Sequence, residues 1–82
     1  MAGAATATLT RSDENRVRYV VAAISEFARH AKLTPRQAHR YLADHGAIEF
    51  LEQHYEAEHL LSFDDAVEDL LRIAAQAGGT IR

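Results

Sequence analysis

The clearest local signal in the sequence is TPRQAHRYLADHG, residues 34–46. It contains a complete helix together with its start and its stop. Thr34 is a helix N-cap, Pro35 fits the first helical position because its missing N–H is not needed there, and Gln37 completes a capping box. Gly46 marks the end of the helix, because glycine adopts the left-handed cap conformation at little cost. The rest of the chain must therefore be arranged around a short helix with defined ends.

The segment before this helix carries a single apolar stripe. Its apolar residues recur at steps of three and four, which places them on one face of a helix. We expect this helix to run from near Ser12 to about Lys32, with Thr10 or Ser12 as its N-cap and with Asp13 and Glu14 at the positive end of its dipole. The stripe consists of Val17, Val20, Val21, Ile24, Phe27, Ala28 and Ala31.

Two further helices are expected after Gly46. The first should follow almost at once and end near His59, with apolar residues on one face and glutamates on the other. The second should begin at Ser62, an N-cap followed by an acidic residue three positions later. Glycines at positions 78 and 79 should stop it. Both helices are amphipathic, so each needs a packing partner.

These segments predict an all-α fold, a compact four-helix domain with short connections. No stretch of the sequence alternates apolar and polar residues with the period of two that marks a strand. We expect the domain to span residues 11–79, between tails at residues 1–10 and 80–82. Its core should contain Val20, Ile24, Phe27, Leu42, Leu51, Phe63, Val67 and Leu70.

The composition favours one small domain and shows no catalytic signature. The chain has 82 residues, 48% of them apolar, and no cysteine, so it has neither a disulfide nor a cysteine nucleophile. It contains no phosphate-binding loop and no nucleophile elbow, and no two histidines have the spacing of a helical zinc site. We expect a non-enzymatic protein without metal or cofactor. In the acidic cluster of Asp64, Asp65, Glu68 and Asp69, we expect no carboxyl group with a selectively raised pKa. The lack of cysteine and of any membrane-spanning apolar run favours the cytoplasm.

Charge is divided unevenly along the chain. Residues 1–40 carry seven Lys and Arg against three Asp and Glu, whereas residues 41–82 carry two against nine. This asymmetry predicts an oriented surface that meets a partner of complementary sign, with tyrosine as an interface residue. We expect Glu58 to lie on the exposed acidic face. The candidate partner-binding residues are Glu49, Glu52, Tyr55, Glu56, His59, Asp64, Asp65, Glu68 and Asp69.

Two other functions fit parts of this pattern. Residues 34–56 have the outline of a helix-turn-helix, so a small DNA-binding or regulatory protein is one alternative. Its second helix, however, would expose glutamates that phosphates repel. A self-associating structural domain, joined through its oppositely charged faces, is the other alternative. The basic residues that could contact a nucleic acid backbone are Arg29, Lys32, Arg36 and Arg40, with His30 and His39.

A set of short motifs in fixed order resembles a family of small bacterial domains of unknown function. The resemblance implies an antitoxin-like or accessory partner for an ADP-ribosyltransferase-like toxin enzyme, beside which such domains are often encoded. The family's recurring Tyr and His fall on Tyr55 and His59, and we expect a buried His59 that hydrogen-bonds the end of the third helix. The motifs are Val20 with Phe27-Ala28, Tyr41-Leu42 before Gly46, Ile48 with Phe50-Leu51, Tyr55-Glu56, His59, Ser62 and Asp65-Ala66-Val67-Glu68-Asp69.

Overall fold

The computed structural model describes residues 11–78, which form five α-helices and no strand. The all-α prediction is thus confirmed for this part of the chain. The expected tails at residues 1–10 and 80–82 lie outside the described residues, as does Gly79. The helices are α2 (Arg11–Ala31), α3 (Pro35–Asp44), α4 (Ala47–Gln53), α5 (Tyr55–Glu58) and α6 (Phe63–Gln76).

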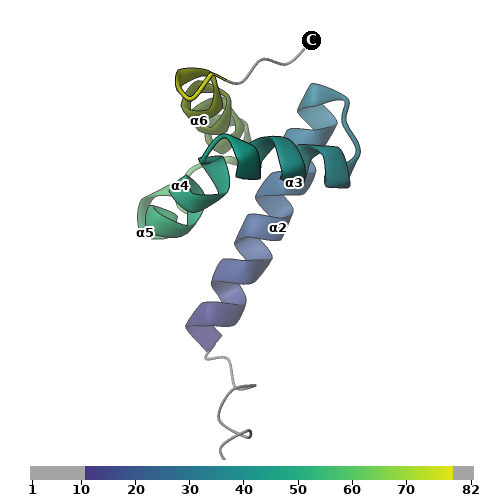
Figure 1. Ribbon diagram of the computed structural model, residues 1–82. Helices are drawn as coiled ribbons and strands as arrows, with labels where there is room; N and C mark the ends of the chain where they lie inside the picture. Colours follow the sequence, from purple (N-terminus) through teal and green to yellow (C-terminus); the bar gives the residue numbers. More distant parts are fainter. Residues whose placement is uncertain (1–10, 79–82) are drawn as a thin grey trace, which may run out of the picture.

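The long helix α2 organises the others. Helix α3 crosses its C-terminal half, α4 and α5 lie beside it, and α6 packs against the same C-terminal half (Figure 1). The N-terminal end of α2 extends past the other helices. Because α2 already includes Ser12, this residue is not its N-cap, and Thr10 lies outside the described part of the chain.

The local sequence sets the ends of α3 as predicted. The backbone N–H of Gln37 donates to the Thr34 hydroxyl at 3.1 Å, and the Gln37 side chain accepts the Thr34 N–H at 2.9 Å. This is a complete capping box with proline at the first helical position. Gly46 follows the C-cap with a φ of 76°, and Gly78 follows α6 with a φ of 93°. Both glycines therefore end helices in the left-handed conformation.

Helix α2 ends without a glycine. Lys32 takes the left-handed position with a φ of 59°. The N–H of Leu33 donates to the Ala28 carbonyl at 2.9 Å, which is the bond of a Schellman cap. Leu33 is then directed against the core. A lysine in this conformation costs about 1 kcal/mol that glycine would not.

The third predicted helix is broken, which is why the prediction of four helices is wrong. The backbone of His54 has a φ of −112° and a ψ of 25°, outside the helical region, so α4 stops after seven residues and the four-residue α5 begins anew. No proline or glycine marks this break in the sequence. The apolar residues keep their helical spacing on both sides of this position, so the sequence pattern does not reveal the break.

Each of the three short helices ends at a histidine whose ring packs against the aromatic ring one turn earlier, stacked for His59 and tilted for His45 and His54. The four-residue spacing brings the two rings together on one helix face. The Nδ1 atoms of His45 and His59 lie 2.7 and 2.8 Å from the carbonyl oxygen of the same aromatic residue. The predicted hydrogen bond of His59 is confirmed, but its predicted burial is wrong, since the residue is exposed. The pairs are Tyr41–His45, Phe50–His54 and Tyr55–His59, with ring centroids 4.7, 4.8 and 4.4 Å apart.

The core lies between the C-terminal half of α2 and helices α3, α4 and α6. The prediction fails for Phe63, which is 38% exposed, and Val20 is half-buried. Val17 and Val21 were expected on the buried stripe of α2, yet they are 54% and 57% exposed. Small alanines let the helices approach closely. The predicted core residues that are buried are Ile24, Phe27, Leu42, Leu51, Val67 and Leu70.

Candidate functional site

An open apolar groove lies between α2, α3 and α4. Its volume is about 260 Å³, which is below the range of about 300–1,000 Å³ that is typical of small-molecule pockets. The hollow therefore suits a few apolar side chains of another protein better than a metabolite. We call it the α2–α4 groove; it is lined by Arg16, Val17, Val20, Val21, Ile24, His39, Ile48 and Glu52.

The groove is open because the N-terminal half of α2 extends past its neighbours (Figure 1). Val17 and Val21 stand one turn apart on this half, and both are more than half exposed. Ile24, at the inner end of the groove, is 8% exposed and belongs to the core. The groove is thus an apolar surface continuous with the core. Contiguous exposed apolar surface of this kind is typical of interaction sites in small proteins.

Arg16 connects this groove to a cluster of aromatic rings around α5. Its guanidinium carbon lies 5.1 Å from the centroid of the Tyr55 ring, within the range of a cation–π contact. Its Nε is buried and has no hydrogen-bond partner. The Tyr55 ring also stacks on the ring of His59. The position of the Arg16 head therefore depends on where α5 holds the Tyr55 ring.

Tyr19 is at the centre of the aromatic cluster. Its ring centroid lies 5.6 Å from that of Tyr55 and 6.0 Å from that of Phe63. Its hydroxyl donates to the backbone carbonyl of Glu58 at 3.1 Å. Burial, and then the nearby charges of Glu58 and Asp69, together raise the pKa of the Tyr19 hydroxyl to about 12. Tyr19 therefore ties α5 to α2 and stays neutral.

Glu58 is buried beneath this cluster, where the sequence predicts an exposed acidic residue. It is 5% exposed, and its Oε1 has no hydrogen-bond partner. Burial, then a hydrogen bond to Asp69 and the charge of Asp69, raise the pKa of Glu58 to about 7 against the opposing charge of Arg72. Glu58 lies outside the acidic cluster for which the sequence predicts no selectively raised pKa, and the pKa of Asp69, which belongs to that cluster, is lowered. Glu58 lies three residues after Tyr55, so the two side chains share the side of α5 that packs inward.

Asp69 is the charged member of this carboxyl pair. The hydrogen bond from Glu58, and then that from Arg72, lower the pKa of Asp69. Arg72 Nη2 lies 3.0 Å from Asp69 Oδ1. A protonated Glu58 can thus donate to a carboxylate that already has a cation on its other side. The sequence contains no signal for Arg16, and it predicts Tyr19 as an interface tyrosine and Glu58 as part of an exposed acidic face, whereas both are packed inside the fold.

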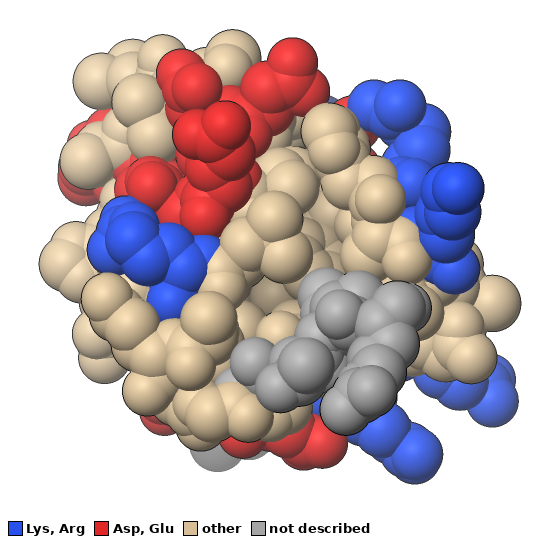
Figure 2. Space-filling model, turned by 90° about the horizontal axis from the view of Figure 1, so that it is seen from above, with Lys and Arg blue, Asp and Glu red and all other residues tan. Residues whose placement is uncertain are grey.

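The nine predicted site residues lie on α4, α5 and α6 and at the C-terminal end of α5. Of these, Glu52 lines the groove, and Tyr55 and His59 belong to the aromatic cluster with Asp69 beneath it. In Figure 2, acidic side chains gather on one side of the visible face and most basic ones on the other, which agrees with the division of charge along the chain. The remaining predicted residues are exposed: Glu49, Glu56, Asp64, Asp65 and Glu68.

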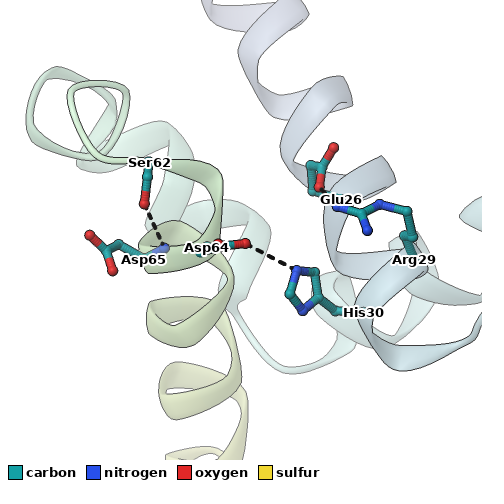
Figure 3. A network of polar contacts seen from close by, with 6 residues as sticks. All are labelled: Glu26, Arg29, His30, Ser62, Asp64 and Asp65. Atoms are coloured by element: carbon teal, nitrogen blue, oxygen red, sulfur yellow. Dashed lines mark hydrogen bonds and ion pairs between the residues drawn. The ribbon is translucent and has the colours of Figure 1, made fainter.

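Residues at the N-terminal end of α6 make contacts that stabilise the fold. The Ser62 hydroxyl accepts the backbone N–H of Asp65 at 3.1 Å, as the sequence predicts. Asp64 Oδ1 lies 3.3 Å from Nε2 of His30, which points toward it from the C-terminal half of α2 (Figure 3). A second hollow of about 230 Å³ opens beside this contact, lined by Phe27, His30, Ala31, Val67 and Leu71. None of the nine predicted site residues lines it.

Residues 11–78 also bear on two other features, a metal centre and a membrane-spanning helix. Within this range, no three His, Asp or Glu side chains are grouped closely enough to hold a metal ion. None of the helices described there has the length and apolar character needed to cross a membrane. The groove and the adjoining aromatic cluster are therefore the candidate site.

Comparisons with curated proteins and with solved structures gave no match. A family model does match: the one described as protein of unknown function (DUF3791) aligns with residues 18–74. The aligned stretch covers most of the chain and includes the aromatic cluster from Tyr19 to Phe63, together with the pair formed by Glu58 and Asp69. The chain therefore belongs to this family of unknown function, DUF3791.

Proposed function

We propose that this chain is a non-enzymatic protein-binding module that acts as an antitoxin-like or accessory partner and neutralises a cognate toxin enzyme. The observation that carries the binding role is the α2–α4 groove with its exposed Val17 and Val21. These two valines leave water on binding a partner. Full burial of a valine side chain contributes about 1.5–3 kcal/mol, so the pair can supply much of the affinity of a small interface.

An amphipathic helix of the partner suits the shape of this site. Such a helix places apolar side chains one turn apart into a groove, which matches the one-turn spacing of Val17 and Val21. Arg16 and Glu52 line the groove with opposite charges. They favour a helix that carries complementary charges beside its apolar residues. The exposed acidic residues elsewhere steer a basic partner toward the chain, as long-range charge does in general.

The antitoxin-like role rests on the sequence resemblance, as do the bacterial origin and the toxin partner. Our proposal includes a cytoplasmic location. The toxin would be inhibited by a chain that covers or distorts its active site, which requires a stable complex and no chemistry from this chain. A partner that binds the folded form alone would also stabilise the small domain by mass action.

The described helices do not support the helix-turn-helix alternative, in which the second helix of the motif would be the reading helix that contacts the DNA bases. Helix α4 would be the reading helix, but it is seven residues long and exposes Glu49 and Glu52. Both would be repelled by a phosphate backbone. Self-association remains the second candidate, because a second copy could also cover Val17 and Val21. The mass of the purified chain in solution distinguishes self-association from binding to a different protein.

The test is co-expression with the product of the adjacent gene. We expect a complex that survives purification, and a loss of affinity of about tenfold or more when Val17 and Val21 are both replaced by serine. The matched control is Leu60→Ser, because Leu60 is 77% exposed but lies outside the groove. Recovery of the chain alone would contradict the proposal. A dimer of the chain whose mass falls in the valine variant would favour self-association.

A further inference from the structure

Glu58 occupies an unusual position for a carboxyl group. It lies on α5, a helix of four residues between the break at His54 and the turn that leads to α6. Helices this short have no stability of their own. Helix α5 must therefore be held in place by its contacts, which are the Tyr19 hydroxyl bond to the Glu58 carbonyl and the buried Glu58 side chain.

The charge on Glu58 decides whether this contact is favourable. In its neutral form the carboxyl donates to Asp69, whose negative charge Arg72 balances. In its ionised form it would be a second carboxylate beside Asp69, in a buried position with Oε1 unpaired. Burying an unpaired charge is strongly unfavourable. Ionisation of Glu58 therefore opposes docking of α5.

The groups that face Glu58 come from all three helices around it. Asp69 on α6 acts against the negative charge of the Glu58 side chain by repulsion, and Tyr19 on α2 donates its hydroxyl to the Glu58 backbone carbonyl. Arg72 attracts it but is already paired with Asp69. The remaining charged or titratable groups of the cluster are Arg16 on α2 and Tyr55 and His59 on α5.

Undocking of α5 would affect the α2–α4 groove through the position of the Arg16 side chain. The Tyr55 ring on α5 supports the Arg16 guanidinium at 5.1 Å, and Arg16 is one of the lining residues of the groove. When α5 leaves α2, Tyr55 leaves with it, and the Arg16 head loses its cation–π contact. A lining residue of the groove then changes position without any direct contact between Glu58 and the groove.

We infer that Glu58 is a proton-operated switch that couples the docking of α5 to the shape of the α2–α4 groove, so that the chain binds its partner more tightly when Glu58 is protonated. The part concerning the partner rests on the function proposed above. Docking itself is a property of the isolated chain. The two parts can therefore fail separately.

The test is a pH titration of the whole chain by NMR, from about pH 5.5 to 8.5, across the ordinary physiological range. Three signals are followed: the Glu58 side-chain carboxyl carbon, the ring protons of Tyr19 and Tyr55, and the methyl groups of Val17 and Val21. We expect all three to change with one midpoint near pH 7, where the pKa of Glu58 lies. In Glu58→Gln, whose amide can donate to Asp69 in the same way, the rings and methyls should keep their low-pH positions throughout.

Glu56→Gln is the matched control, because Glu56 lies on the same short helix and is exposed. It should titrate as the natural chain does. A ring transition that survives in Glu58→Gln would overturn the switch. Rings that stay still while the Glu58 carboxyl titrates would also overturn it. If Glu58→Gln does not fold, coincidence of the three midpoints in the natural chain remains the deciding observation.

The link to binding has its own readout. In complex with the partner, the natural chain should lose up to about tenfold in affinity for each pH unit above the transition, the limit for one coupled proton, whereas Glu58→Gln should not. Tyrosine rings that titrate while the valine methyls stay still would overturn the coupling to the groove. Valine variants that bind the partner normally would instead contradict the proposed function and leave α5 docking intact.

Discussion

The two halves of α2 have similar apolar spacing but very different surroundings. In the C-terminal half, Ile24 and Phe27 are buried beneath α3, α4 and α6, with Phe27 completely inaccessible. In the N-terminal half, Val17 and Val21 are exposed, and Tyr19 packs against α5 through aromatic rings and a hydrogen bond. The comparison teaches that hydrophobic period identifies a helix face, whereas the neighbouring helices decide how much of that face is covered.

This difference separates stability from binding. The C-terminal half holds the domain together by apolar burial, which is the dominant favourable term in folding. The N-terminal half contributes less burial and presents apolar area to a partner. Each prediction below alters one half of α2 or the contacts made by it.

Phe27→Ala should have the largest effect on stability. Removal of a fully buried phenylalanine side chain costs about 3–5 kcal/mol, a large part of the total stability of a small domain. Val21→Ala, in the exposed half, should change the free energy of unfolding by about 0.5 kcal/mol or less. Urea denaturation of the two variants compares the halves directly. Equal losses would contradict the division between them.

The next largest effect is a pH dependence of the free energy of unfolding. It arises from Glu58, which contacts the N-terminal half of α2 through Tyr19. Burial and Asp69 raise the pKa of Glu58 from 4.5 to about 7 in the folded chain. The folded state then binds the proton more tightly, so the free energy of unfolding should fall as pH rises from about 4.5 to about 7 and level off above. The loss is at most about 3–4 kcal/mol, because a difference of one unit in pKa is worth about 1.4 kcal/mol.

Glu58→Gln should remove this slope, as measured by denaturation at a series of pH values. The window is distinct from that of Asp69, whose lowered pKa makes its contribution disappear only in more acidic solution. Glu56→Gln should retain the slope. A natural chain whose stability is flat over this range would show that Glu58 is not held in its neutral form.

Tyr19→Phe should cost about 1 kcal/mol, the usual net contribution of one hydrogen bond. It removes the hydroxyl that donates to the Glu58 carbonyl and keeps the ring contacts with Tyr55 and Phe63. The natural chain should also lose stability above about pH 10, because the pKa of Tyr19 is raised to about 12. The phenylalanine variant should lose less stability there. An unchanged alkaline profile would argue against a buried Tyr19 hydroxyl.

The smallest effect is expected at the C-terminal end of α2. Lys32→Gly should raise the free energy of unfolding by up to about 1 kcal/mol, because glycine adopts the left-handed conformation without strain but loses more backbone entropy on folding. Thermal denaturation measures this change. The neighbouring exposed residue Arg29, which is inside the helix, provides the control, since Arg29→Gly should destabilise the chain by about 1 kcal/mol.

The local parts of the fold could be predicted from the sequence. The capping box at Thr34, the stop at Gly46 and the N-cap at Ser62 depend on a few neighbouring residues, so their structure follows from short motifs. The break at His54 could not be predicted, because no helix breaker stands there. It accompanies the packing of aromatic rings against histidines at the helix ends, which composition and period do not reveal.

The candidate site was predicted less well, for a related reason. The charge of Glu58 predicts an exposed residue, but α5 begins anew after the break at His54 and places Glu58 on its buried side, together with Tyr55. The exposure of Val17 and Val21 depends on how far α3 and α4 reach along α2. That distance is set by packing between helices, so it is a tertiary property that one helix cannot reveal.

The central claim is that the exposed half of α2 binds a partner while the buried half maintains the fold. It is tested most directly by a methyl NMR titration of the chain with the protein that co-purifies with it. We predict that the methyl groups of Val17, Val21 and Ile48 shift or broaden on binding, while those of Leu60 and Leu71, exposed elsewhere, stay unchanged. Perturbation of the two leucines with an unaffected groove would contradict this account.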